Sequence, residues 1–130
     1  MWGNIEALFR LSEVEAELPS DLERYEKATD LPVRYVPVRS EAEVLGFVWA
    51  CDADAAAGYE PRSAAGQAAF DAAREWLLRL GEAKADGLTP SQALERLASA
   101  LRTGGAGWLS VESADTAPSL DALQDYSGRC

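Results

Sequence analysis

Histidine is absent from this 130-residue chain, and only two cysteines occur, Cys51 and Cys130. Without histidine, the usual general base at neutral pH, the Ser-His and Cys-His nucleophilic pairs and imidazole metal ligands are excluded. Two cysteines cannot form a four-cysteine zinc site, and their spacing is unlike that of disulfide-stapled domains. The chain also has no P-loop and no GxGxxG motif, so nothing indicates nucleotide binding. We therefore expect no cofactor and no metal.

Long apolar runs are missing as well. The longest uninterrupted one, residues 44–51, is far shorter than the ~20 residues that a membrane-spanning helix needs. Residues 1–10 include charges and lack a basic segment followed by an apolar one, so no secretory signal is expected. These absences predict a cytoplasmic protein without membrane contact. A preference for arginine over lysine, together with abundant alanine, indicates a GC-rich bacterial genome.

Basic residues are few, because 12 Lys and Arg against 22 Asp and Glu give a net charge of −10. This charge repels phosphate backbones, so nucleic-acid binding is not expected. Residues 87–101 contain the glycine turn of a helix-turn-helix, but that helix offers only Gln92, Arg96 and Arg102 to a groove. Net acidity favours either simple solubility or a basic protein partner.

Hydrophobic periodicity predicts an α+β fold, in which a small antiparallel sheet packs against two helices. One globular domain is expected over 1–112, followed by a C-terminal tail over 113–130. The expected elements are short N-terminal helices including one over 21–28, a hairpin of strands 33–39 and 44–51, a long helix over 63–86, a second helix over 89–103, a candidate third strand near 107–112, and a candidate docking helix capped by Ser119.

Prolines and glycines refine the expected sheet. Pro32 and Pro37 lack an amide hydrogen, which favours an edge position for strand 33–39. Gly46 marks a bulge or a close backbone approach in the second strand. Residues 52–62 contain turn residues and no stable period, so we expect a loop that rejoins the sheet only briefly near Tyr59.

The candidate functional residues lie mainly in this predicted loop. Asp52 and Asp54 form a D-x-D pair that, with Glu60, could supply oxygen ligands to a divalent cation. Acidic residues also end strands because they are solvated there, and we expect this role and no metal. Tyr59, Glu60 and Arg62 could orient a small polar ligand, or form an ordinary turn that Tyr59 anchors in the core.

Tryptophan occurs four times, which is frequent for a chain of this length. Trp49 and Trp76 lie in apolar segments and are expected in the core. Trp2 and Trp108 lie in terminal or glycine-flanked segments, so they are candidates for a partner surface or a contact within a homo-oligomer. Acidic residues are concentrated between residues 13 and 30 and predict an acidic surface.

These patterns do not identify a function. Sparse reactive residues and plentiful aromatic and acidic candidates favour a non-catalytic intracellular protein-interaction domain, such as an inhibitor, an immunity-type protein or an accessory protein with a basic partner. The alternative is a small-molecule or metal-dependent enzyme that uses residues 52–62. The alternative requires those side chains to converge in a concave pocket.

Overall fold

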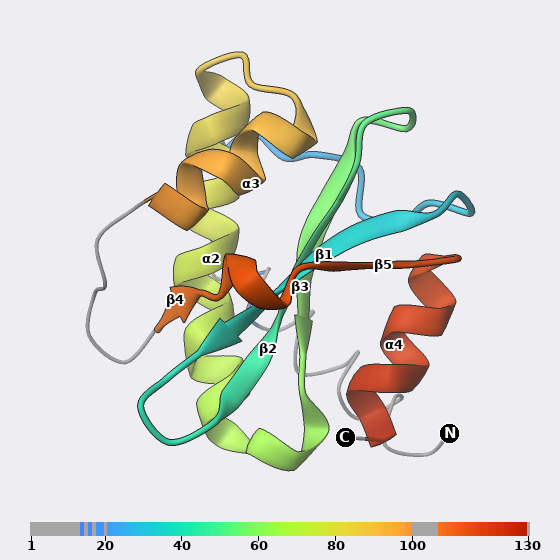
Figure 1. Ribbon diagram of the computed structural model, residues 1–130. Helices are drawn as coiled ribbons and strands as arrows, with labels where there is room; N and C mark the ends of the chain where they lie inside the picture. The colour runs from blue at the N-terminus through green and yellow to red at the C-terminus, as the bar shows by residue number, and fades with distance from the viewer. Residues whose placement is uncertain (1–13, 15, 17, 20, 100–106, 130) are drawn as a thin grey trace.

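Helices cover both faces of one five-stranded antiparallel sheet, so the fold is α+β as the sequence predicts (Figure 1). This computed structural model describes residues 14–129 except 15, 17, 20 and 100–106. The strands are β1 (Val33–Arg39), β2 (Val44–Cys51), β3 (Ala56–Pro61), β4 (Trp108–Leu109) and β5 (Asp115–Ala117). The helices are η1 (Ser63–Ala65), α2 (Gln67–Ala85), α3 (Pro90–Ser99), η3 (Val111–Ser113) and α4 (Leu120–Arg129). Among the described helices, none is long and apolar enough to cross a bilayer.

The predicted hairpin is confirmed, but β1 lies inside the sheet and not at its edge. The strand order is β3-β2-β1-β4, and β5 also pairs with β1. The Pro37 carbonyl accepts a hydrogen bond from Ser110 N at 2.9 Å, so the proline nitrogen faces the same side of the strand. On that side η3 separates β4 from β5. Pro37 therefore lacks its amide hydrogen at a position where η3 already interrupts the hydrogen bonds between β1 and its neighbours β4 and β5.

The bulge predicted at Gly46 is also present. Val38 pairs with Gly46 whereas Arg39 pairs with Val44, so one residue of β2 is left without an opposite partner. A Cβ at Gly46 would lie 2.6 Å from the Glu60 carbonyl oxygen, much closer than real Cβ atoms come. Glycine is thus required here for the approach of β3.

The loop expected over 52–62 is wrong, because residues 56–61 form β3, which pairs with β2 along its length. Only residues 52–55 form a turn. This strand has no recognisable strand pattern in the sequence, because it consists largely of small residues and contains no β-branched ones. At Gly58, a Cβ would lie 2.9 Å from the Trp49 ring, so the small residues let the indole pack over β3.

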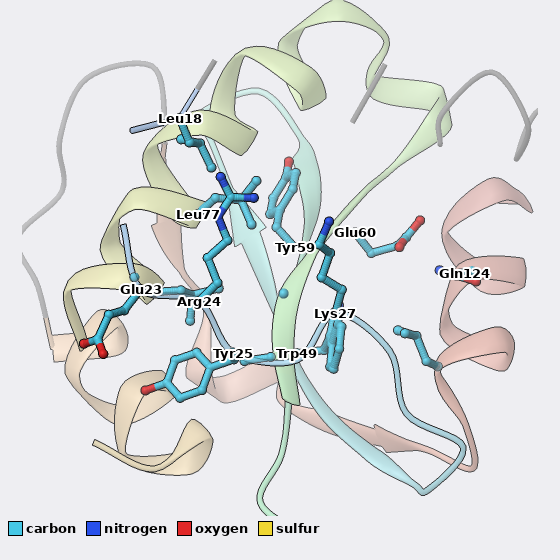
Figure 2. A pocket seen from close by; sticks show the side chains of 15 residues that line it. Leu18, Glu23, Arg24, Tyr25, Lys27, Trp49, Tyr59, Glu60, Leu77 and Gln124 are labelled. Carbon is cyan, nitrogen blue, oxygen red and sulfur yellow. The ribbon is translucent and has the colours of Figure 1, made fainter. Parts of the chain in front are cut away.

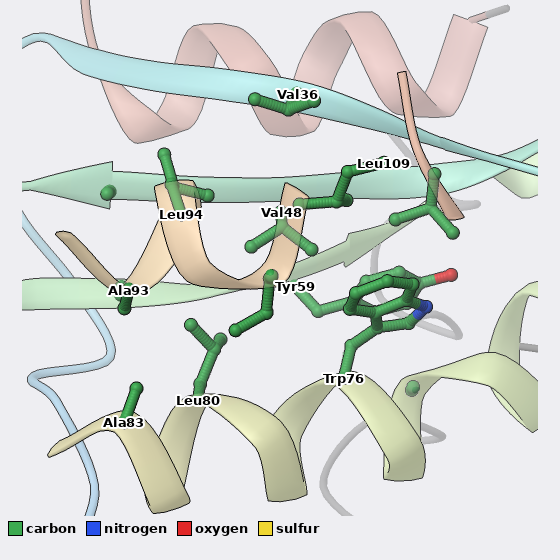
Figure 3. Packing of buried hydrophobic residues seen from close by; sticks show 14 of the residues in the cluster. Val36, Val48, Tyr59, Trp76, Leu80, Ala83, Ala93, Leu94 and Leu109 are labelled. Carbon is green, nitrogen blue, oxygen red and sulfur yellow. The ribbon is translucent and has the colours of Figure 1, made fainter. Parts of the chain in front are cut away.

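The larger core lies between one face of the sheet and helices α2 and α3. Trp76 is fully buried, as predicted, and packs in this core with Val48 and Leu94 (Figure 3). The long helix predicted over 63–86 is present as α2 over residues 67–85, but Gly66, with φ of 61°, separates it from the short 3-10 helix η1. α3 begins with the predicted cap, in which the Thr89 hydroxyl accepts from Gln92 N at 3.2 Å.

A smaller core lies on the opposite face, beneath α4 (Figure 1). Leu120 and Leu123 of α4 pack there with Phe47 and Trp49 of β2. The Ser119 hydroxyl caps α4 as predicted and accepts a hydrogen bond from Ala122 N at 3.1 Å. β5 and α4, both within residues 113–130, thus contribute to the sheet and to one of its two covering layers.

The helix predicted over 21–28 is wrong, since none of these residues is helical. Tyr25 is buried and its hydroxyl donates to the Leu88 carbonyl at 2.7 Å, while Glu26 bridges Ala56 of β3. These tertiary contacts outweigh the local capping pattern. Gly81 of α2 makes them possible, because a Cβ there would lie 2.6 Å from Leu22. Val14 and Ala16 are helical, and the rest of the expected N-terminal helix lies outside the described residues.

Candidate functional site

The two aspartates of the D-x-D pair have separate structural roles. Asp52 Oδ1 accepts a hydrogen bond from Ser91 N at 2.8 Å and so caps the N-terminus of α3. Asp54 accepts a hydrogen bond from the Thr29 hydroxyl. In the part of the chain that the structure describes, no three Asp, Glu, Cys or His residues are placed to hold a metal ion. Asp52 therefore joins the turn between β2 and β3 to α3, and Asp54 joins it to the segment at Thr29.

Arg62 and Trp108 lie at the end of the sheet opposite the D-x-D pair, with β2 and β1 between them. Arg62 Nε donates to the Val44 carbonyl at 2.7 Å, and its guanidinium forms an ion pair with Glu43 at 3.1 Å. It thus joins the end of β3 to β2. Trp108 is half-buried in β4, opposite Arg39. Trp2 lies outside the described residues.

Tyr59 and Glu60 point to opposite faces of β3, as neighbours in a strand must. The Tyr59 hydroxyl donates to the Ala69 carbonyl at 2.7 Å, inside the larger core. Burial raises the pKa of Tyr59 far above its usual value, and the nearby Glu60 charge raises it further. Tyr59 is therefore a neutral anchor, one of the two roles that the sequence suggests for it.

Glu60 faces α4 and is a buried carboxyl group, with 7% of its surface exposed. Burial raises its pKa to about 7, although side-chain hydrogen bonds with Gln124 and Ser127 act to lower it. Ser127 is itself 1% exposed, and its single hydroxyl proton is shared between Glu60 and the Gln124 carbonyl, which lies 2.9 Å from Ser127 Oγ. At neutral pH both protonation states of Glu60 are thus accessible.

Glu60 lies at a pocket of about 230 Å³ between the N-terminal segment, α2, β3 and α4 (Figure 2). The walls are mainly apolar, and Gly58 leaves room there for the Trp49 indole. The apolar or aromatic lining residues are Leu18, Tyr25, Trp49, Ala57, Gly58, Tyr59, Leu77, Leu80, Gly81 and Leu120. The polar ones are Glu23, Arg24, Lys27, Glu60 and Gln124.

The polar lining residues come from two sides. Glu60 projects from β3 toward Gln124 on α4, whereas Arg24 and Lys27 belong to the segment that runs past β3 from the N-terminal side (Figure 2). The pocket therefore combines a buried carboxyl group, Glu60, and an exposed one, Glu23, with two cationic side chains in mainly apolar surroundings. Such groups can fix the orientation of a small polar ligand.

Sequence reasoning singled out Tyr59 and Glu60 but missed the α4 partners of Glu60. A signal for them was present, because Leu120, Leu123, Gln124 and Ser127 follow helical spacing on one face. Two polar residues on an otherwise apolar stripe indicate a buried polar partner across from the helix. Residues 21–28, predicted as a helix, contain no comparable signal for the pocket.

Comparison of the chain with protein-family models, with curated proteins and with solved structures gives no significant match.

Proposed function

We propose that the protein binds a small molecule in the pocket beside Glu60. The observation that carries this proposal is the buried Glu60 carboxyl group, which lines a mainly apolar pocket and is held from behind by Gln124 and Ser127. A raised carboxyl pKa in a concave apolar site is typical of functional sites in proteins. The volume, about 230 Å³, lies below that of drug-sized pockets, so the ligand is small.

Energetics also favour this proposal over a purely structural role for Glu60. Burying a carboxylate in the folded state is costly, and an apolar residue would cover the α4 side of β3 at no such cost. The two α4 partners reduce this cost but do not offset it, because the pKa stays above its usual value. A ligand that contacts the carboxyl group is the simplest explanation for its presence at this buried position.

A thermal-shift screen tests the proposal. A panel of small compounds of all charge types is added to the protein, and a bound compound at a hundred times its Kd adds about 2.7 kcal/mol, or several degrees in Tm. Leu77→Phe fills the pocket from α2 and should abolish these shifts. Leu78→Phe is the matched control, since Leu78 is half-buried in the same helix but does not line the pocket. The absence of any compound whose effect depends on Leu77 would refute the proposal.

A protein-interaction domain with an acidic surface remains the second candidate. The segment around residues 26–30 lies against the turn between β2 and β3, because Glu26 N donates to the Ala55 carbonyl and the Thr29 hydroxyl donates to Asp54. The exposed acidic residues of these two segments are Glu26, Asp30, Asp52 and Asp54. A basic protein is the partner such a surface fits. Charge reversal at Glu26 and Asp30 should then abolish partner binding and leave small-molecule binding intact.

An enzyme using the same pocket is distinguishable from a binding protein by the fate of the ligand. Glu60 has the pKa of a general acid or base, which supports this alternative to binding alone. A ligand recovered unchanged after prolonged incubation with the wild-type protein supports binding, whereas turnover that Glu60→Gln abolishes supports catalysis.

A further inference from the structure

The pocket carries groups of both charge signs, and their placement restricts the chemistry of its ligand. Glu60 approaches from β3, while Arg24 and Lys27 approach from the N-terminal segment (Figure 2). The same pocket of about 230 Å³ is lined by Glu60 and by Arg24 and Lys27, so one small ligand bound in it can contact groups of both charges. We propose that the ligand is a small amphoteric molecule of the amino-acid class, with its ammonium group on Glu60 and its carboxylate toward Arg24 and Lys27. This inference rests on the proposed function.

The ammonium end is supported by the surroundings of Glu60. An ionised carboxyl group can accept about four hydrogen bonds, more than its two side-chain neighbours Gln124 and Ser127 supply. The Trp49 indole lies on the same face of the sheet and lines the same pocket. A carboxylate next to an aromatic ring in apolar surroundings favours a cation, through charge-assisted hydrogen bonding and contact with the ring.

The carboxylate end is supported by Arg24 and Lys27. The protein carries a net charge of −10, which disfavours the approach of any anion unless cationic side chains lie close to its binding site. Arg24 supplies a planar guanidinium suited to a carboxylate, and Lys27 adds a second positive charge. A simple amine would be repelled by these two residues, and a simple carboxylate would be repelled by ionised Glu60.

The remaining walls define the third part of the ligand. Leu77 and Leu80 of α2 and Leu120 of α4 present apolar surface to the pocket. Apolar surface of this kind favours an aliphatic or aromatic group over a polar one. The structure therefore favours an amino acid with an apolar side chain over one with a charged side chain.

Isothermal titration with defined compounds tests this inference on the wild-type protein. The probes are L-leucine, L-isoleucine, L-methionine and L-phenylalanine, followed by two analogues of the tightest binder, one without the carboxylate and one without the ammonium group. We expect at least one amino acid to bind and each analogue to bind at least tenfold more weakly. Because the analogues are compared on the unmodified protein, the result does not depend on whether a variant folds.

Variants of the protein then test which residue binds the ammonium group of the ligand and which binds its carboxylate. Glu60→Gln should weaken binding of the amino acid at least tenfold but strengthen binding of the analogue without the ammonium group, because the repelling charge of Glu60 is removed. Arg24→Gln should weaken binding of the amino acid and strengthen binding of the analogue without the carboxylate for the corresponding reason. The matched controls, Glu82→Gln and Arg74→Gln, change exposed residues of α2 that do not line the pocket and should have no effect.

Two outcomes would overturn the inference and leave the proposed function standing. One is equal binding of the amino acid and both analogues, which would mean that only the apolar part is recognised. The other is failure of all four amino acids while a compound of another charge type binds in a Leu77-dependent manner. If no compound of any type binds in that manner, the proposed function itself is wrong.

Discussion

Replacement of Glu60 by glutamine should change how the stability of the protein depends on pH. Burial raises the pKa of Glu60 from its usual 4.5 to about 7 in the folded state. A carboxyl group with a raised folded-state pKa contributes stability below about pH 4.5, and this contribution is lost as pH rises through about 7. The difference of about 2.5 pKa units corresponds to roughly 3 kcal/mol. Glutamine is neutral throughout, so Glu60→Gln should gain about that much relative to wild type between pH 4 and pH 8.

Urea unfolding followed by tryptophan fluorescence measures this difference. The free energy of unfolding is determined for both proteins at pH 4 and pH 8, and subtraction cancels every group that titrates equally in the two. Ser127→Ala should enlarge the pH dependence of the protein that retains Glu60, because the hydrogen bond from Ser127 lowers the pKa of that carboxyl group. A relative change below about 1 kcal/mol, or a gain of the wild type over the variant with rising pH, would refute the assigned burial of Glu60.

Four further predictions concern the scaffold and the turn between β2 and β3. Trp76→Ala should lower the free energy of unfolding by about 3 to 5 kcal/mol because Trp76 is fully buried, and a loss below about 1 kcal/mol in denaturant melts would contradict that burial. Asp52→Ala should lower the free energy of unfolding by about 1 kcal/mol, because the hydrogen bond from Ser91 N to Asp52 at the start of α3 is lost. Asp52→Asn keeps an acceptor oxygen there and should keep most of that stability. Mg²⁺ and Ca²⁺ should leave the Tm of the wild type unchanged, and a rise of several degrees that Asp52→Asn abolishes would reveal a metal site. Gly58→Ala should displace the Trp49 indole and shift its fluorescence, and an unchanged spectrum would contradict the 2.9 Å approach.

The elements that the sequence predicts correctly are those whose stability is local. Trp76 and Leu80 follow helical spacing in α2, and Ser119 caps α4 with its own hydroxyl, so neither depends on distant residues. The hairpin of β1 and β2 likewise follows from apolar and β-branched residues joined by a short connection.

The errors arise where distant contacts outweigh local patterns. The capping pattern near residue 21 predicts a helix, but the contacts of Tyr25 with Leu88 and of Glu26 with Ala56 hold the segment in an irregular path. β3 was not predicted because its small residues have no strand-like pattern. Their role depends on a tertiary contact, the packing of the Trp49 ring over Gly58. Glu60 was a candidate from the sequence, but the helix that buries it lies more than sixty residues further along the chain, at Gln124.

That separation has a consequence for how the chain folds. β1, β2 and β3 follow one another and pair as neighbours, so their ladder forms from contacts close in sequence. The pairing of Val33 with Ala117 and the docking of α4 close far longer loops, which slows their formation. We therefore expect Glu60 to stay hydrated until α4 docks, so that this late step takes up a proton below about pH 7. The refolding rate should then fall as pH rises from about 4.5 to about 7 and level off above it, while Glu60→Gln should refold at a rate that does not follow this titration.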